Sequence, residues 1–251
     1  MLMPIGDDNR DRTTLPLINY LLIIINVIVF VYFQGCGAEQ KFTYKYSLVP
    51  EEIVTGEDIV TDDQVLFDPI TGERVYVTGL QPTPISPYIT FFTSMFMHGS
   101  IAHLLGNMLF LFIFGDNIEH RLGHLRFLLF YLLSGIAASA VQILVTYIIG
   151  GNPLIPTLGA SGAISGILGA YLILYPKKRV RVIMLFYLIT EVPAVIAIGL
   201  WFVFQVINGI GMLGGQTEGG IAYGAHIGGF IAGLLLVGFF LIGRKKPRSV
   251  F

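Results

Sequence analysis

Long apolar runs alternate with polar segments along the chain, and this pattern predicts a polytopic membrane protein. A helix needs about 20 mostly apolar residues to cross a hydrocarbon layer of roughly 30 Å. Six runs approach that length, and the membrane helices are expected at Leu15–Phe33, Ile101–Asn117, Leu125–Ile149, Gly159–Tyr175, within Val180–Met212 opening near Pro193, and within Ala222–Ile242. The expected fold is all-α: a six-helix bundle that forms one membrane domain over residues 15–243.

The segment between the first two runs is polar and long enough to fold. Nine of the sixteen acidic residues lie between residues 34 and 86. Val65–Pro69 and Arg74–Val77 flank a Thr71–Gly72 turn, which predicts a hairpin. We expect residues 34–100 to form a structured extracytoplasmic loop without catalytic residues.

The lysines and arginines indicate how the chain is oriented in the membrane. Twelve of the fifteen fall in segments on one side, and only Lys41, Lys45 and Arg74 fall on the other. By the positive-inside rule, the N-terminal segment 1–14 and the basic tail 244–251 are both cytoplasmic. We expect an uncleaved first span in a multi-pass integral protein of the plasma membrane of a prokaryote.

The composition excludes several classes of function. The chain is 54% hydrophobic and 12% charged, with a mean hydropathy of +0.75. Its basic clusters are short and lie next to the spans, so no nucleic-acid partner is expected. Cys36 is the only cysteine, and no Cys/His cluster is present, so we expect no intrachain disulfide, no redox pair, no metal and no cofactor.

Polar residues inside the predicted spans mark the candidate site, because hydrocarbon penalises them. Four stand out, namely His103, Asn107, Ser161 and His226. With a rise of about 1.5 Å per residue, Ser161 and His103 lie about 21 Å, and His226 about 24 Å, from the cytoplasmic ends of their runs. The three runs cross in the same direction, so a hydroxyl and two imidazoles reach one level in the outer part of the membrane.

A serine and an imidazole at one level predict acyl transfer. A serine is a weak nucleophile until a base accepts its proton, and a neutral imidazole is suited to that near pH 7. We assign Ser161 as the nucleophile and His226 as the general base. Asp116 and Glu191 are expected at the cytoplasmic side, the latter near the end of the fifth helix. A Ser-His dyad without an acidic member is therefore predicted.

Two further residues are candidates for stabilising an oxyanion. Asn107 follows His103 by four residues, so both face the same way on a helix. Their N–H groups, together with the backbone N–H of Ser161, could donate to the negative oxygen of a tetrahedral intermediate. His98 fits either the core or this oxyanion side, while His120 and His124 are expected to be solvated in a cytoplasmic loop.

Each of these features also has a packing interpretation. Gly, Ala and Ser are the usual small residues of close helix contacts in membranes, and a lone intramembrane histidine can hold helices together. Small residues recur in both the fourth and the sixth run, at Gly162, Gly166, Gly169, Gly229 and Gly233. We expect these glycines to be structural and the two helices to pack closely.

The chain resembles the rhomboid family of intramembrane serine proteases. The matching motifs are His98–His103 with Asn107, Glu119–Gly123, Gly159–Gly162, Trp201–Phe202 and Ala225–Gly229. The resemblance implies a six-helix bundle with the serine in a water-filled cavity open to the outside, and a fifth helix and capping loop that gate substrate entry. It also implies that Ser161 is the nucleophile, His226 the base, and His103 and Asn107 the oxyanion side, with Glu119 and Arg121 structural.

One departure from the family pattern concerns the catalytic histidine. Ser165 stands where some members place an aromatic ring beneath this histidine. The orientation of His226 must therefore rest on another residue.

The expected function is that of a serine-type intramembrane endopeptidase that cleaves transmembrane segments near their extracytoplasmic end. Its partners would be the lipid bilayer and transmembrane protein substrates. The alternative is a non-catalytic rhomboid-like protein that binds membrane clients, although such relatives usually lack the serine or the histidine. A transporter is disfavoured, since the chain shows no internal repeats. The sequence leaves the substrate and the oligomeric state open.

Overall fold

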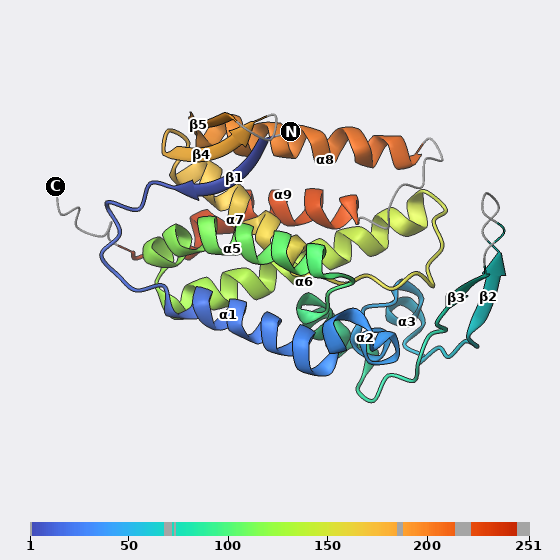
Figure 1. The fold of residues 1–251 in the computed structure, drawn as a ribbon. Coiled ribbons are helices and arrows are strands. Elements are labelled where there is room, and N and C mark those ends of the chain that lie inside the picture. The colour runs from blue at the N-terminus through green and yellow to red at the C-terminus, as the bar shows by residue number, and fades with distance from the viewer. Residues whose placement is uncertain (1, 68–71, 73, 185–187, 214–221, 245–251) are drawn as a thin grey trace.

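The computed structural model describes residues 2–67, 72, 74–184, 188–213 and 222–244, and it is mostly helical (Figure 1). The long helices are α1 (Leu17–Ile28), α5 (Ile101–Leu122), α6 (His124–Ile148), α7 (Ser161–Leu174), α8 (Ala194–Leu213) and α9 (Tyr223–Phe240). Among the described residues, α5, α6, α8 and α9 are long and apolar enough to cross a membrane. Two shorter apolar helices accompany them, α7 and Leu17–Phe33, in which α1 continues through the π-helical turn η1 (Val29–Phe33).

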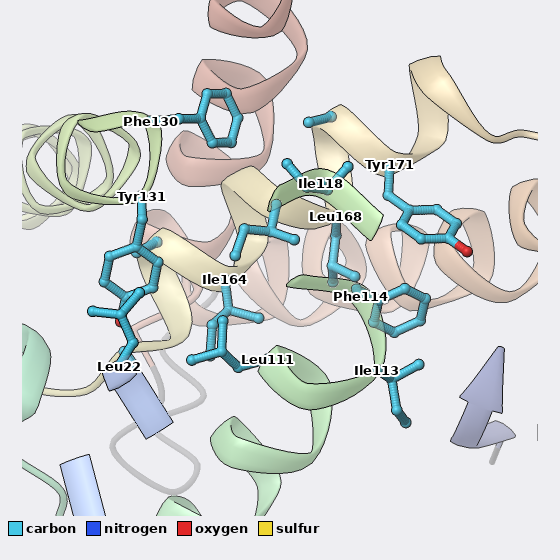
Figure 2. Close-up of a cluster of buried hydrophobic side chains, with 14 of the residues drawn as sticks. Leu22, Leu111, Ile113, Phe114, Ile118, Phe130, Tyr131, Ile164, Leu168 and Tyr171 are labelled. Atoms are coloured by element: carbon cyan, nitrogen blue, oxygen red, sulfur yellow. The ribbon is translucent and has the colours of Figure 1, made fainter. Parts of the chain in front are cut away.

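Helix α7 lies at the centre of the bundle. Every residue from Gly162 to Tyr171 is buried. Figure 2 shows how Ile164 and Leu168 of α7 meet Leu111 and Phe114 of α5 in the core, with Tyr131 of α6 and Leu22 of α1 nearby. Because α7 is enclosed by protein, its serine is reached only where the helix begins.

Glycine allows α7 and α9 to approach at backbone contact. A methyl group added at Gly233 would lie 2.0 Å from the carbonyl oxygen of Gly166, and one at Gly169 would lie 2.3 Å from that of Phe230. Neither position can hold a side chain without moving a helix. The predicted close packing of these two helices is confirmed.

The structure contains a three-stranded sheet, which the expectation of an all-α protein did not include. Strands β1 (Leu2–Asp7), β4 (Arg179–Met184) and β5 (Leu188–Pro193) pair antiparallel in the order β1-β4-β5. β1 belongs to the predicted N-terminal segment, and the sheet lies at one end of the bundle (Figure 1). Arg179 and Arg181 are exposed while Val180 and Val182 are buried, so the local alternation is that of a strand.

The fifth helix begins later than the start of its apolar run, Val180–Met212. Helix α8 starts at Ala194, directly after Pro193, which agrees with the predicted opening near that proline. Glu191, expected near the cytoplasmic end of the fifth helix, lies instead in β5. It faces Arg181 of β4 across 3.6 Å, and both side chains are exposed.

The long first loop is structured. It contains η2 (Gly35–Gly37), α2 (Gln40–Tyr46), α3 (Pro50–Thr55), β2 (Gln64–Phe67), β3 (Arg74–Val77), η3 (Pro87–Ile89), α4 (Thr90–Thr93) and η4 (Ser94–Phe96). β2 and β3 pair antiparallel, which confirms the predicted hairpin, and the hairpin projects from the end of the bundle opposite the sheet (Figure 1). Within its turn, residues 68–71 and 73 lie outside the described part, as do residues 214–221 and most of the basic tail, 245–251.

Helix α5 is longer than predicted, and its C-terminal part contacts the start of α1. It runs five residues past Asn117, to Leu122. Near this end the buried carboxylate of Glu119 accepts hydrogen bonds from the backbone N–H groups of Ile18 and Asn19, at 2.9 and 2.7 Å. These two groups are unsatisfied donors in the first turn of α1, so Glu119 caps a helix far away in sequence.

One of the two histidines near Glu119 is buried, against the expectation that both are solvated. His120 is 6% exposed, and its Nδ1 is hydrogen-bonded to the Thr14 hydroxyl at 2.7 Å. This expectation was wrong for His120, because α5 extends through it and the N-terminal segment covers it. The His124 side chain is 49% exposed and contacts Glu119.

Candidate active site

The first residue of α7 is Ser161, two residues after Gly159. Gly159 has φ of +117°, a conformation that residues with a side chain rarely adopt, and its N–H donates to the carbonyl of Ser94 at 2.9 Å. The free N–H groups of a helix's first turn, and the positive end of its dipole, lie beside the serine. This end of α7 therefore favours negative charge near the Ser161 hydroxyl.

The structure brings His226 to this hydroxyl. His226 lies in the first turn of α9, and its Nε2 is 2.8 Å from Ser161 Oγ. The close approach of α7 and α9 permits this contact between residues 65 positions apart. Neutral histidine can accept the serine proton at Nε2 only if Nδ1 carries the ring hydrogen.

Nδ1 has a partner that the sequence analysis did not single out. It lies 2.7 Å from Oε1 of Gln205 on α8, whose side chain is buried. The sequence did carry a signal, since a glutamine within an apolar run invites the same attention as an intramembrane histidine. His226 is thus held at both ring nitrogens.

Aromatic rings border the imidazole. The Trp201 ring lies 6.1 Å from the His226 ring at an interplanar angle of 38°, and the Tyr223 ring lies 6.3 Å away, nearly perpendicular. Ser165, which replaces an aromatic of some family members, donates its hydroxyl to the Ser161 carbonyl at 2.7 Å. The orientation of His226 accordingly rests on α8 and on Tyr223.

The predicted oxyanion residues lie on α5. A methyl group at Gly159 would lie 2.8 Å from His103 Nε2 and 3.7 Å from Ser161 Oγ, so both side chains border the same small space. Asn107, one turn further along α5, is 7% exposed, and its Nδ2 has no hydrogen-bond partner among the described residues. An unpaired amide donor is therefore buried on the helix that carries His103.

His98 lies behind His103 rather than at the hydroxyl. It is fully buried, with its ring 5.1 Å from the His103 ring and 6.5 Å from the edge-on Phe30 ring. Its backbone is fixed by Gln34, which accepts from its N–H at 3.0 Å and donates to its carbonyl at 2.8 Å. His98 therefore belongs to the core that supports His103.

The two acids considered at the sequence level lie apart from this group. Asp116 is buried and faces Arg12 of the N-terminal segment at 3.3 Å, and Glu191 faces Arg181. A small pocket adjoins the serine and is lined mostly by small residues, including Ser94, Gly159, Ala222 and Ala225. The arrangement offers a nucleophile, a base and nearby donors, which are the parts required for acyl transfer.

Comparison with known proteins places Ser161, His226, Gln205, His103 and Asn107 within one family match. Residues 86–243 match the family model described as "Rhomboid domain". Similar proteins include Rhomboid protein 1, mitochondrial, of Saccharomyces cerevisiae (32% identical over 171 residues, 68% of this chain and 47% of that protein). RHOMBOID-like protein 4 of Arabidopsis thaliana is 36% identical over 155 residues (59% and 32%), and Rhomboid protease GluP of Bacillus subtilis is 37% identical over 141 residues (56% and 24%). The matched part of the chain spans less than half the length of each of these relatives.

Proposed function

The chain belongs to the rhomboid family, and we propose that it is a serine-type intramembrane endopeptidase that cleaves transmembrane segments near their extracytoplasmic end. The observation that carries this proposal is the 2.8 Å contact between Ser161 Oγ and His226 Nε2. One of its relatives, GluP of Bacillus subtilis, is named a protease. The mostly apolar helices support the coarser statement that the chain is a multi-pass membrane protein.

The first step of the proposed reaction is attack by the serine. Ser161 Oγ bonds to the scissile carbonyl carbon as its proton passes to His226 Nε2, which leaves a tetrahedral intermediate with a negative oxygen. Donors aimed at that oxygen lower the barrier more than any other single feature of such sites. The Ser161 backbone N–H, the Asn107 amide and the His103 ring are the proposed donors.

The remaining steps return the enzyme to its starting state. The protonated His226 gives its proton to the leaving amine nitrogen as the C–N bond breaks, and the acyl group stays on Ser161. A water molecule then loses a proton to His226 and attacks the ester carbonyl. Collapse of the second intermediate returns the proton to Ser161 and releases the new carboxylate end.

The class of substrate follows from the surroundings of the site. The residues of the site come from apolar helices, so a scissile bond reaches the site most readily from within the membrane. A transmembrane helix hides its carbonyl groups in its own hydrogen bonds, because hydrocarbon offers them no other partner. We therefore expect substrates whose helix unwinds near the outer membrane face, where small or helix-breaking residues make unwinding cheaper.

The orientation is part of the same proposal. Six spans with both termini in the cytoplasm follow from the lysine and arginine distribution, with α1 and α7 as the two shorter spans. The sheet of β1, β4 and β5 then lies at the cytoplasmic side and the β2–β3 hairpin outside. The proposed location is the plasma membrane of a prokaryote.

A fluorophosphonate probe tests the proposal without knowledge of the substrate. Such probes react with serines that a neighbouring base activates, so the wild-type protein should be labelled and Ser161→Ala and His226→Ala should not. Labelling that persists in Ser161→Ala would place the reactive group elsewhere. A folded wild-type protein that is not labelled would favour the non-catalytic client-binding alternative.

A further inference from the structure

We propose that Gln205 is a positioning residue, which holds His226 in the tautomer that can accept the Ser161 proton. This role rests on the proposed function, because it concerns the same reaction. It makes the site a linear hydrogen-bonded series of three residues, each on its own helix. Ser161 is on α7, His226 on α9 and Gln205 on α8.

The geometry fixes the direction of both hydrogen bonds. An amide oxygen can only accept, so Gln205 Oε1, at 2.7 Å, requires that His226 Nδ1 carries the hydrogen. Nε2 of the neutral ring then has a free lone pair, and it faces the Ser161 hydroxyl at 2.8 Å. In the opposite tautomer two acceptors would face each other at Nδ1 and Oε1, and Nε2–H would donate to Ser161 Oγ, so Nε2 could not accept the serine proton.

The placement of Gln205 on α8 is unlike that of its neighbours. Leu200, Val203, Phe204 and Ile207 of the same helix are all exposed apolar residues, whereas Gln205 is only 5% exposed. Burying an amide costs free energy unless it is hydrogen-bonded. The helix nevertheless directs this one amide inward, toward α9.

Asn208, three residues later on α8, shows what an amide does there without such a partner. Its Nδ2 donates to the carbonyl of Phe204 in its own helix, at 2.7 Å. Gln205 instead reaches across to another helix and contacts the group that must move a proton. The contrast favours a role in the site over simple satisfaction of a polar side chain.

A neutral third residue suits this environment better than a carboxylate. An unpaired charge inside a membrane costs several kcal/mol, by the order of magnitude of insertion scales. An amide oxygen orients the imidazole through a dipole and adds no net charge. It also keeps its bond when the ring is protonated, since Nδ1 remains a donor throughout the reaction.

Kinetics on the full chain in proteoliposomes test this role, with cleavage of a single-span reporter substrate as the readout. Gln205→Met keeps the approximate volume but removes the acceptor, and kcat should fall about 10- to 100-fold with KM unchanged. Gln205→Glu keeps an acceptor oxygen, because a buried carboxyl stays protonated and neutral while its carbonyl oxygen still accepts, so this variant should recover most of the lost kcat. Asn208→Leu, the matched loss of an amide on α8, should keep wild-type kinetics.

Two results would overturn the role of Gln205. One is a Gln205→Met variant with wild-type kcat, and the other is a Gln205→Glu variant no better than Gln205→Met. These differ from failure of the proposed function itself, in which cleavage would survive Ser161→Ala or would be absent from the wild type. Cleavage that requires Ser161 but does not change when residue 205 is replaced would contradict the role of Gln205 and leave the proposed function standing.

A spectroscopic measurement needs no change at position 205. With ¹⁵N-labelled histidine, the His226 signals are identified by their loss in His226→Ala. We expect a protonated Nδ1 with a hydrogen-bonded proton and an unprotonated Nε2 at neutral pH. A ring protonated at Nε2 would overturn the inference even if every Gln205 variant failed to fold.

Discussion

A methyl group on Gly229 would stand 2.1 Å from the carbonyl oxygen of Gly162, so α7 and α9 touch through their backbones at the level of the site. Ser161 precedes Gly162 directly, and His226 lies one turn before Gly229. The contact between the two helices is thus part of what places the hydroxyl against the imidazole. Small residues at such positions let membrane helices approach closely enough for side chains to interact.

Gly229→Ala should therefore destabilise the protein and separate the two helices. The expected loss is about 1–3 kcal/mol, the usual cost of an added methyl group in a well-packed core. Gly238→Ala is the matched control on the same helix, since nothing lies within 4 Å of the added methyl there. Thermal unfolding in detergent should show a lower midpoint for Gly229→Ala only, and equal midpoints would contradict the close contact.

Glu119 is expected to contribute to stability through its two bonds to the start of α1. Pro16 at the N-cap supplies no side-chain hydrogen bond, and Glu119 is 1% exposed. Glu119→Ala would leave two backbone donors without an acceptor, at a cost of about 1–3 kcal/mol. Glu191→Ala, which removes an exposed acid 3.6 Å from Arg181, should change stability by less than about 0.5 kcal/mol. Chemical unfolding of both variants checks this, and similar losses would contradict the capping role.

Asn107→Ala should slow the chemical step. If the buried, unpaired amide donates to the oxyanion, its removal should lower kcat by about 10²- to 10³-fold. KM should hardly change, because the bond forms only as negative charge develops. Steady-state cleavage in liposomes separates the two constants, and a rise in KM at constant kcat would assign Asn107 to substrate binding.

The burial of Asp7 in the sheet region predicts that the stability of the protein depends on pH. Its Oδ2 accepts from Tyr171 and Asn117, while Oδ1 is buried without a hydrogen-bond partner in the described part of the chain. Burial, above all, raises the pKa of Asp7 to about 7, and the nearby Asp116 adds to this, against the opposing effects of the Tyr171 hydrogen bond and of Lys178.

The sign follows from the protons that each state holds. Between about pH 4 and pH 7 the folded state retains the Asp7 proton, whereas the unfolded state has lost it. Asp7 therefore makes the free energy of unfolding fall as pH rises through this range, and the fall ends above about pH 7. Asp7→Asn should remove this component. The unfolding midpoint of Asp7→Asn should therefore rise relative to that of the wild type between pH 5 and pH 8. A constant difference would contradict the raised pKa.

Sequence patterns are informative about faces and depths, and less so about contacts. Helical rise alone brought Ser161, His103 and His226 to one level, and the recurrence of glycines predicted which two helices touch. Rotation about each helix axis is not fixed by depth, and for that reason the partner of His226 Nδ1 was not identified. Gln205 reaches that atom only because α8 presents its one buried amide to α9.

The sheet was missed for a different reason. The alternation at Arg179–Val182 is that of a strand, but it merges with the apolar run that follows, and a strand needs partners to be recognised. One partner, β1, lies more than 170 residues earlier. Pairing at that separation depends on how the bundle folds as a whole, as does the burial of His120 by the N-terminal segment.

The proposed reaction requires Ser161 and His226 to cleave a peptide bond together inside the membrane. It is tested most directly by cleavage of a single-span substrate in liposomes that contain the wild-type protein, Ser161→Ala or His226→Ala. The wild type should cleave the substrate, and both variants should fail to do so although their unfolding midpoints show that they are folded. Cleavage by Ser161→Ala at the wild-type rate would contradict the proposed reaction.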